Sequence, residues 1–561
     1  MMVHGYRRQD SIVGRSQGFP VNDRQFVLAC LAIFAVAVFL RLYHLGMEEL
    51  WLDEALTAHL INQTDWTLPV EHNTPPLYYT VLRLWSLAAG NSEFALRFVS
   101  ALLGSFFVLA TIWMGKEVFN SSVGVWSGLF VAVNPVAIYY AQEARTYTLL
   151  LLLLSLVYTN LWKAVTRNSM KNWLLFCVCA LLSLYSHYFA ALALVPTAVL
   201  LLLWPTDERK DLRWRYYGCA VVCCAVFFLP FAAFKFLGAG QLTGLAWLEA
   251  MWRQTSPWLL ILRSLEIFGV GPQPGVTFLD FKQWVSLDVP VWLHPIGVSL
   301  IGLLTVAALA PLGDRTLEVP QIGRRKIWLV ALVCVPLLLL LSLSFVRPLY
   351  LVGRYDLVGF AAYPIVLGLG AAKLQRVDRF GSWIMLGVGM CLLGVVGTKL
   401  FLYYGTSTPS HRANARVTAS YLEAKVKNGD VVVFTGLRGA PVIYYLGRLG
   451  YRWSAGRCVN GKNRRAFGCR MFPRETESHL GSFEPGRVWN SRDAVRSDLS
   501  EFVQDLGSRN SVWVVVGSGK NIAGVIQVSR LDSFLLTELQ NKGYAPQSLH
   551  GAPIILRFTK P

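Results

Sequence analysis

Long apolar runs alternate with short polar segments along the first 405 residues of the chain. Most runs are close to the roughly 20 residues that a helix needs to cross a bilayer. The stretch 173–204 is too long for one span and has basic clusters on both sides, so it predicts a hairpin of two. Eleven spans are therefore expected, at about 26–43, 94–114, 123–139, 147–161, two within 173–204, 217–236, 291–312, 327–345, 357–372 and 383–403.

Basic residues between the runs predict an orientation. The tail 1–25 carries Arg7, Arg8, Arg15 and Arg24. Loops on the cytoplasmic side are rich in Lys and Arg, so this tail is expected in the cytoplasm and the end of the eleventh span at the outer face. The first run has no small-residue cleavage site and is expected to remain as an anchor. The apolar segment 75–90 is short and opens with two prolines, which predicts a helix lying on the outer surface.

The composition agrees with a polytopic α-helical membrane protein. Hydrophobic residues make up 54% of the 561 residues and charged residues only 15%, which is unusual for a soluble protein. The formal net charge of +19 would also suit a nucleic-acid-binding protein, but the basic residues are confined to short clusters between apolar runs. We therefore expect membrane lipids around the chain and no nucleic acid as a partner.

Residues 406–561 have the pattern of a soluble domain. The runs 430–434 and 511–517 predict buried strands, whereas 440–446 and 533–542 predict helices. We expect a small α/β domain outside the membrane.

This domain contains two cysteines, Cys458 and Cys469, eleven residues apart in a basic loop. In an oxidising compartment such a pair is expected to form a disulfide.

Polar residues gather in the loops predicted at the outer face. Asp53 and Glu54 directly follow the first span, where a carboxylate can lie at the membrane surface without burial in hydrocarbon. Taken alone, the pair could simply solvate the end of a helix. The other polar residues of these loops that we single out are His72, Asn73, Glu143, Arg145, His187, Tyr188, Arg347 and Arg354.

The order of these residues resembles the lipid-dependent glycosyltransferases of the GT-C fold, specifically the protein O-mannosyltransferase and aminoarabinose (lipid A) transferase superfamily. The strongest element is the acidic pair followed by Pro75-Pro76-Leu77-Tyr78 and then by Ser92–Arg97. Further elements are Gln142–Tyr147, His187–Phe189 and Gly353–Tyr355. The resemblance implies a GT-C-like glycosyltransferase domain over 26–405, which uses a polyprenyl-phosphate sugar as donor.

The resemblance also implies roles for the outer residues. Asp53 matches the catalytic base, which takes the proton of an acceptor hydroxyl as that hydroxyl attacks the anomeric carbon with inversion. Glu54 and Glu143 would orient acceptor or sugar, and Arg145 and Arg354 would hold the phosphate. Substrate contacts are expected from His72, Asn73, His187, Tyr188 and Arg347. No metal and no cofactor is expected.

Two departures from the family leave the sugar and the acceptor open. Aminoarabinose transferases carry a Lys just before the Pro-Pro-Leu element, where this chain has Asn73-Thr74. The acid of the second outer loop is often Asp in those relatives and is Glu143 here. The acceptor could be a glycolipid, a polysaccharide or a protein, and the bacterial inner (plasma) membrane is the expected location.

Other interpretations remain open at this stage. Arg145 could pair with Glu143 and cap the fourth span, His187 could be a turn histidine in an aromatic belt, and Arg347 could contact lipid headgroups. A lipid or sugar transporter or flippase would also be basic and polytopic, although it would carry ionisable residues inside its spans, which are largely free of charge here. The spans could also serve only as an anchor for the C-terminal domain.

Overall fold

The computed structural model describes residues 23–62, 75–204, 210–238, 252, 256–272, 290, 292–311, 314, 317, 319–376, 380–405, 415–435, 439–454, 456–461, 464–472, 506, 511–515, 535–547 and 555–559. Residues 1–22 of the tail and the candidate residues His72 and Asn73 lie outside this part of the chain.

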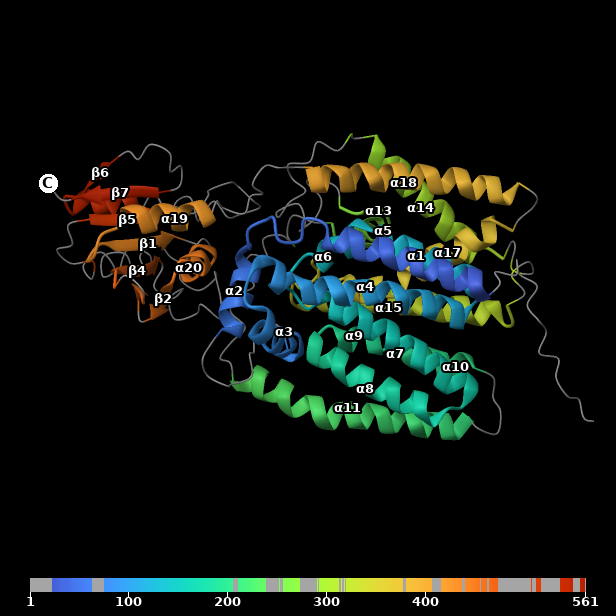
Figure 1. Ribbon diagram of the computed structural model, residues 1–561. Coiled ribbons are helices and arrows are strands. Elements are labelled where there is room, and N and C mark those ends of the chain that lie inside the picture. Colours follow the sequence, from blue (N-terminus) through green and yellow to red (C-terminus); the bar gives the residue numbers. More distant parts are fainter. Residues whose placement is uncertain are drawn as a thin grey trace, which may run out of the picture.

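A bundle of apolar helices forms the first part of the molecule (Figure 1). It consists of α1 (Asp23–Leu42), α4 (Glu93–Val118), α5 (Ser121–Val133), α6 (Pro135–Ala141), α7 (Tyr147–Arg167), α8 (Met170–Ser186), α9 (Ala190–Leu194), α10 (Thr197–Leu203), α11 (Lys210–Gly238), α13 (Leu260–Val270), α14 (Leu293–Leu309), α15 (Ile322–Val346), α16 (Leu357–Phe360), α17 (Tyr363–Leu374) and α18 (Gly381–Gly405), with a 3-10 turn, η1 (Pro257–Leu259), before α13.

Seven segments of the described chain are long and apolar enough to cross a membrane, or eight if the bent pair α5–α6 is one span. The polytopic helical fold is thus confirmed, and the chain is an integral membrane protein. Three shorter apolar helices, 170–186, 190–203 and 293–309, fall where further spans were expected. The count of eleven stays a prediction.

The helices differ in how much of their surface other helices cover. In α7 and in the segment Leu357–Leu374, 89% and 94% of the apolar window is buried inside the bundle, whereas α1 and Asp211–Phe234 bury only 17%. Apolar side chains that no protein covers require a lipid environment, because water would penalise so large an exposed area. The first two segments therefore form the centre of the bundle, and the other two form its lipid-facing margin.

Two short helices lie at one end of the bundle, next to the C-terminal domain (Figure 1). They are α2 (Leu52–Ile61) and α3 (Leu77–Ala89), and we call this end the site end. On α3, Tyr78, Tyr79 and Leu82 are buried, whereas Leu84 and Leu87 are exposed. One apolar face therefore packs on the protein and another faces outward, as expected for a helix on a membrane surface.

The bend between α5 and α6 measures 60°. Asn134 occupies it, caps the first turn of α6 through its side-chain oxygen, and donates from Nδ2 to the carbonyl of Phe268 at 2.8 Å. The guanidinium of Arg41 donates to the carbonyls of Val131 and Ala132, both at 3.0 Å. The broken span is therefore stabilised by a cation at the C-terminal end of α5 and a side-chain cap at the start of α6.

Two cations are buried within helices that are otherwise largely free of charge, as the sequence indicated. Arg41 on α1 and Lys399 on α18 are both 0% exposed. The ammonium of Lys399 lies 2.9 Å from the carbonyl of Val270, at the C-terminal end of α13, and 3.0 Å from Nδ1 of His294. Both cations meet the free carbonyls at a helix end, a partner that cannot be identified from hydropathy.

The C-terminal part is an α/β domain built on a seven-stranded sheet of order β2-β3-β4-β1-β5-β7-β6. Its elements are α19 (Ala415–Lys425), β1 (Val431–Thr435), α20 (Gly439–Arg448), β2 (Tyr451–Ser454), β3 (Arg457–Asn460), β4 (Ala466–Phe472), β5 (Ser511–Val515), β6 (Ala545–Gln547) and β7 (Ile555–Thr559), with a further helical segment at 535–541. The central strand β1 is parallel to both neighbours. Both of its faces are buried, as the unbroken apolar run predicted.

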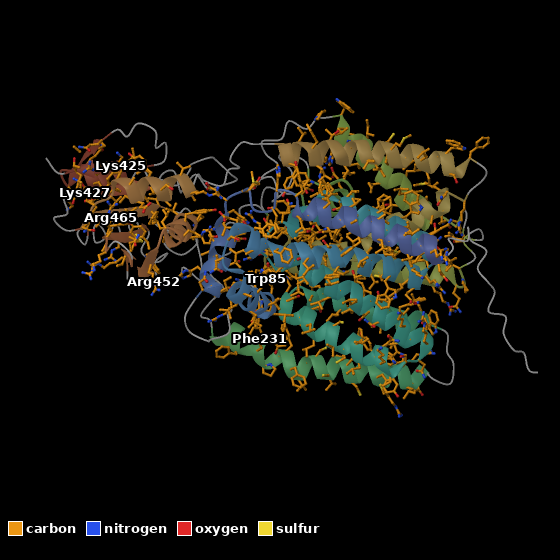
Figure 2. All side chains as sticks on the ribbon, viewed as in Figure 1. Trp85, Phe231, Lys425, Lys427, Arg452 and Arg465 are labelled. Atoms are coloured by element: carbon orange, nitrogen blue, oxygen red, sulfur yellow. A yellow bond between two sulfur atoms is a disulfide. The ribbon has the colours of Figure 1, made fainter. Side chains whose placement is uncertain are left out.

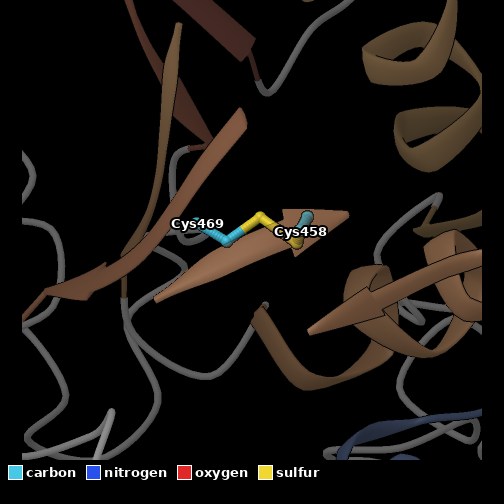
Figure 3. The surroundings of a disulfide bond; sticks show 2 residues. All are labelled: Cys458 and Cys469. Atoms are coloured by element: carbon cyan, nitrogen blue, oxygen red, sulfur yellow. A yellow bond between two sulfur atoms is a disulfide. The ribbon is translucent and has the colours of Figure 1, made fainter. Parts of the chain in front are cut away.

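Cys458 on β3 and Cys469 on β4 form a disulfide across the antiparallel pair of strands (Figure 3). Both residues are buried in the core that the sheet shares with α19 and α20.

Candidate active site

Helix α2 begins at Leu52 and presents Asp53 in its first turn at the site end. A carboxylate is favoured there because the free N–H groups of a first turn carry partial positive charge. The side chain of Asp53 remains 16% exposed. It is therefore held in place and still open to a reactant.

Arg354 links Asp53 to the centre of the bundle. Its Nη2 donates to Oδ2 of Asp53 at 2.8 Å, and its Nε donates to the hydroxyl of Tyr147 at 2.6 Å. The Arg354 side chain is 10% exposed. The residues of this pair are 301 positions apart in the sequence, so the fold alone brings the expected base and an expected phosphate-binding cation into contact.

The turn that carries Arg354 is fixed by the conformation of Gly353 and by two hydrogen bonds to it. Gly353 has a φ of +78°, a conformation that favours glycine. The hydroxyl of Tyr140 donates to the Gly353 carbonyl, and the Gly353 N–H donates to Oδ2 of Asp356 at 3.0 Å. Burial, although opposed by hydrogen bonds, raises the pKa of the Asp356 carboxyl to about 6. Asp356 was not singled out from the sequence, where one acid at the start of an apolar run carries no distinct signal.

Glu54 points away from Asp53 into a closed pocket of hydrogen bonds. Nε and Nη2 of Arg97 donate to its two oxygens at 2.7 Å each, and the Ala144 N–H donates to Oε1 at 3.0 Å. The Glu54 side chain is 0% exposed. Both oxygens are enclosed by the protein, which favours a structural role, and the expectation that Glu54 orients a substrate stays a prediction. Glu54 joins α2 to α4 and to the turn before α7.

Glu143 and Arg145 lie in that turn, between α6 and α7, and both are buried. Oε1 of Glu143 accepts from the Tyr139 hydroxyl at 2.6 Å. Nη1 of Arg145 lies 3.4 Å from Oγ1 of Thr57, one turn after Asp53 on α2. The structure thus places Arg145 beside α2, and Glu143 within the same turn.

His187 closes the site from the loop between α8 and α9. Its ring lies 5.7 Å from that of Tyr147 and 6.1 Å from that of Tyr355. Burial, and then the charges of Arg354 and Arg145, lower the pKa of His187 to about 3. A neutral ring accepts the Phe189 N–H at Nδ1, so its proton is placed on Nε2. His187 can therefore donate one hydrogen bond from Nε2.

The two other described candidates are Tyr188 and Arg347. Tyr188 is half-buried, with its ring centroid 6.3 Å from that of Phe228 on α11, and burial raises its pKa to about 12. Arg347 follows the last residue of α15 and is half-buried.

Comparison with known proteins bears on the fold. The family model of dolichyl-phosphate-mannose-protein mannosyltransferases matches residues 73–234. The crystal structure of ArnT from Cupriavidus metallidurans in the apo state superposes with a TM-score of 0.55 at 11% identity, covering 96% of this chain and 98% of that one. The chain has the GT-C fold. A second ArnT structure, bound to undecaprenyl phosphate, matches with a TM-score of 0.52 at 10% identity over 96% and 98% of the two chains.

An archaeal oligosaccharyltransferase is also similar in fold. The oligosaccharyltransferase AglB from Archaeoglobus fulgidus, in complex with an inhibitory peptide and a dolichol-phosphate, has a TM-score of 0.51 at 10% identity and covers 96% of this chain and 75% of that one. A search of curated protein sequences finds no match. The architecture expected from the sequence resemblance is therefore confirmed at the level of the fold and superfamily.

Proposed function

We propose that the chain transfers a sugar from a polyprenyl-phosphate donor to an acceptor hydroxyl at the outer face of the membrane, with inversion at the anomeric carbon. The observation that carries the proposal is the contact of Asp53 with Arg354, which combines a partly exposed carboxylate with a buried guanidinium at the site end. The fold is that of ArnT and AglB, of which one has been crystallised with undecaprenyl phosphate and the other studied with a dolichol-phosphate.

In the proposed reaction a base accepts a proton and cations stabilise the departing phosphate. The acceptor oxygen forms a bond to the anomeric carbon, the bond from that carbon to the phosphate oxygen breaks, and the hydroxyl proton passes to Asp53. The lipid phosphate leaves with one more negative charge than it had in the donor. Cations held in place before the reaction stabilise such charge effectively, because no solvent has to reorganise.

Arg354 and Arg145 are the cations that this scheme requires. Arg354 has a fork of donors, of which Nε is held by Tyr147 and Nη2 by Asp53. A donor phosphate would compete with Asp53 for this guanidinium. The carboxylate would then lose its partner and become a stronger base when the donor is bound. In this scheme, Glu143 and the neutral His187 orient sugar or acceptor by hydrogen bonds and take no proton.

A transfer assay tests the proposal. Purified chain in lipid vesicles is supplied with a panel of radiolabelled polyprenyl-phosphate sugars and with envelope extract as a source of acceptors. We expect label to move to an acceptor for at least one sugar, together with release of polyprenyl phosphate. A transporter or flippase would instead move intact donor between leaflets, and label that crosses the bilayer without cleavage would overturn the proposal.

A further inference from the structure

The C-terminal domain packs directly against the elements that present Asp53. Leu50, Ala55 and Ala58 of the α2 region share one hydrophobic core with Leu422 of α19 and Leu446 of α20. This core also contains residues of α3, β1, β4 and β5. The domain is therefore continuous with the site end of the bundle.

A carboxylate on α4 is held by two helices of the domain, α19 and α20. Oε1 of Glu93 accepts from Nη2 of Arg416 at 2.8 Å, and Oε2 accepts from Nη1 of Arg448 at 2.8 Å. The Glu93 side chain is 10% exposed, whereas the two arginines are nearly half exposed. Each oxygen has its own cation, so the two helices are fixed relative to the first residue of α4.

A second set of contacts reaches the segment just before α2. The carboxylate of Glu49 accepts from the N–H groups of Ala415 and Arg416, at 2.7 and 3.3 Å, and so caps the start of α19. The hydroxyl of Tyr445 on α20 accepts from the Leu50 N–H at 2.9 Å. The segment that enters α2 is therefore hydrogen-bonded to the domain at two successive residues, through the side chain of Glu49 and the N–H of Leu50.

The same segment is connected to the carboxylate pair. Arg97 lies four residues after Glu93 on α4, one helical turn away, and its Nη2 donates both to the carbonyl of Glu49 at 3.0 Å and to Glu54. Glu54 is the neighbour of Asp53. Direct contacts thus run from α19 to Glu49, from Glu49 to Arg97 and from Arg97 to Glu54, the residue beside Asp53.

We infer that the C-terminal domain positions the base of the transferase, and that Arg416, Arg448 and Tyr445 are positioning residues for Asp53. The inference rests on the proposed function for its catalytic consequence. These residues contact α4 and the entry to α2, and none of them contacts Asp53 itself. A displacement of a reacting group by about 1 Å can reduce turnover on the order of a hundredfold, so loss of the contacts should affect turnover more than donor affinity.

The test is the double variant Arg416→Gln/Arg448→Gln in the full-length chain. Hydrogen exchange by mass spectrometry is expected to show at least about tenfold faster exchange of the amides of α2, with no change in α7, because locally destabilised elements open separately from the core. In the transfer assay kcat is expected to fall at least about tenfold, while KM for the donor stays within about threefold. Arg416→Lys/Arg448→Lys, which keeps both charges, should recover most of the loss.

The matched control is Lys425→Gln/Lys427→Gln. These two exposed lysines belong to the same domain, at the end of α19 and just after it, and lie on its side away from the bundle (Figure 2). This control should leave exchange and turnover unchanged.

Failure of the inference and failure of the proposed function can be told apart. Normal exchange of α2 and normal turnover in the double variant would overturn the inference and leave the transferase proposal intact. If the wild-type chain transferred no sugar, the exchange experiment would still decide whether the domain fixes α2.

Discussion

The buried ion pair between Glu54 and Arg97 gives the sharpest test of the geometry around α2. The two side chains are 0% and 2% exposed and meet through two hydrogen bonds of 2.7 Å. Removing one partner of a buried pair leaves an uncompensated charge and costs about 3–5 kcal/mol of stability. Arg97 also donates to the carbonyls of Leu45, Glu48 and Glu49, which reduces the loss, so about 3 kcal/mol is expected for Glu54→Gln.

The assay is thermal unfolding of the purified protein in detergent for Glu54→Gln, Arg97→Met and the double variant. Both single variants should unfold at clearly lower temperature. The double variant should lose less than the sum of the two, because residues in direct contact are not additive. A Glu54→Gln protein with wild-type stability and a raised KM for the acceptor would refute the reasoning and restore the direct substrate contact that the sequence suggested.

Three further variants probe other contacts. Arg354→Lys keeps one charge but cannot bind Tyr147 and Asp53 together, so kcat/KM is expected to fall about a hundredfold with weaker donor binding, and unchanged kinetics would exclude a phosphate role. As pH falls from about 6.5, the ordinary pKa of histidine, towards 3, the unfolded chain protonates His187 while the folded chain keeps it neutral, so the wild type loses stability. His187→Asn should reduce this loss. A wild-type denaturation midpoint that is independent of pH in this window would contradict the buried neutral ring. Cys458→Ser/Cys469→Ser should destabilise the C-terminal domain by about 2–3 kcal/mol, since the disulfide closes a short loop, and unaltered unfolding of this domain would show that the bridge is dispensable.

The sequence predicted most helices correctly because the apolar runs have the length that a bilayer demands. It missed features that depend on partners distant in sequence. One is α13, which falls between the seventh and eighth expected spans but packs against α14, and whose Ile267 and Phe268 are buried. Another is the 60° bend at Asn134, because a single Asn before Pro135 resembles an ordinary position within a span.

The sequence indicated several of the residues that gather near α2, but not their contacts with one another. The motif Ser92–Arg97 is part of the resemblance. Its sequence, however, does not indicate that Arg97 forms hydrogen bonds with Glu54, 43 positions earlier. Likewise, the contact of Asp53 with Arg354 spans 301 positions and could only emerge from the fold. The orientation of the site end, the domain limits and the roles of the site residues stay predictions.

The most direct test of the central claim is single-turnover transfer by Asp53→Asn beside Glu143→Gln, with donor binding measured on the same preparations. Loss of a base removes both proton abstraction and charge stabilisation, so Asp53→Asn should fall by at least about a hundredfold while donor binding is largely kept. Glu143→Gln should fall less, because Glu143 orients a substrate without taking a proton. Near-normal turnover by Asp53→Asn, together with complete loss in Glu143→Gln, would contradict the assignment and move the base to the turn before α7.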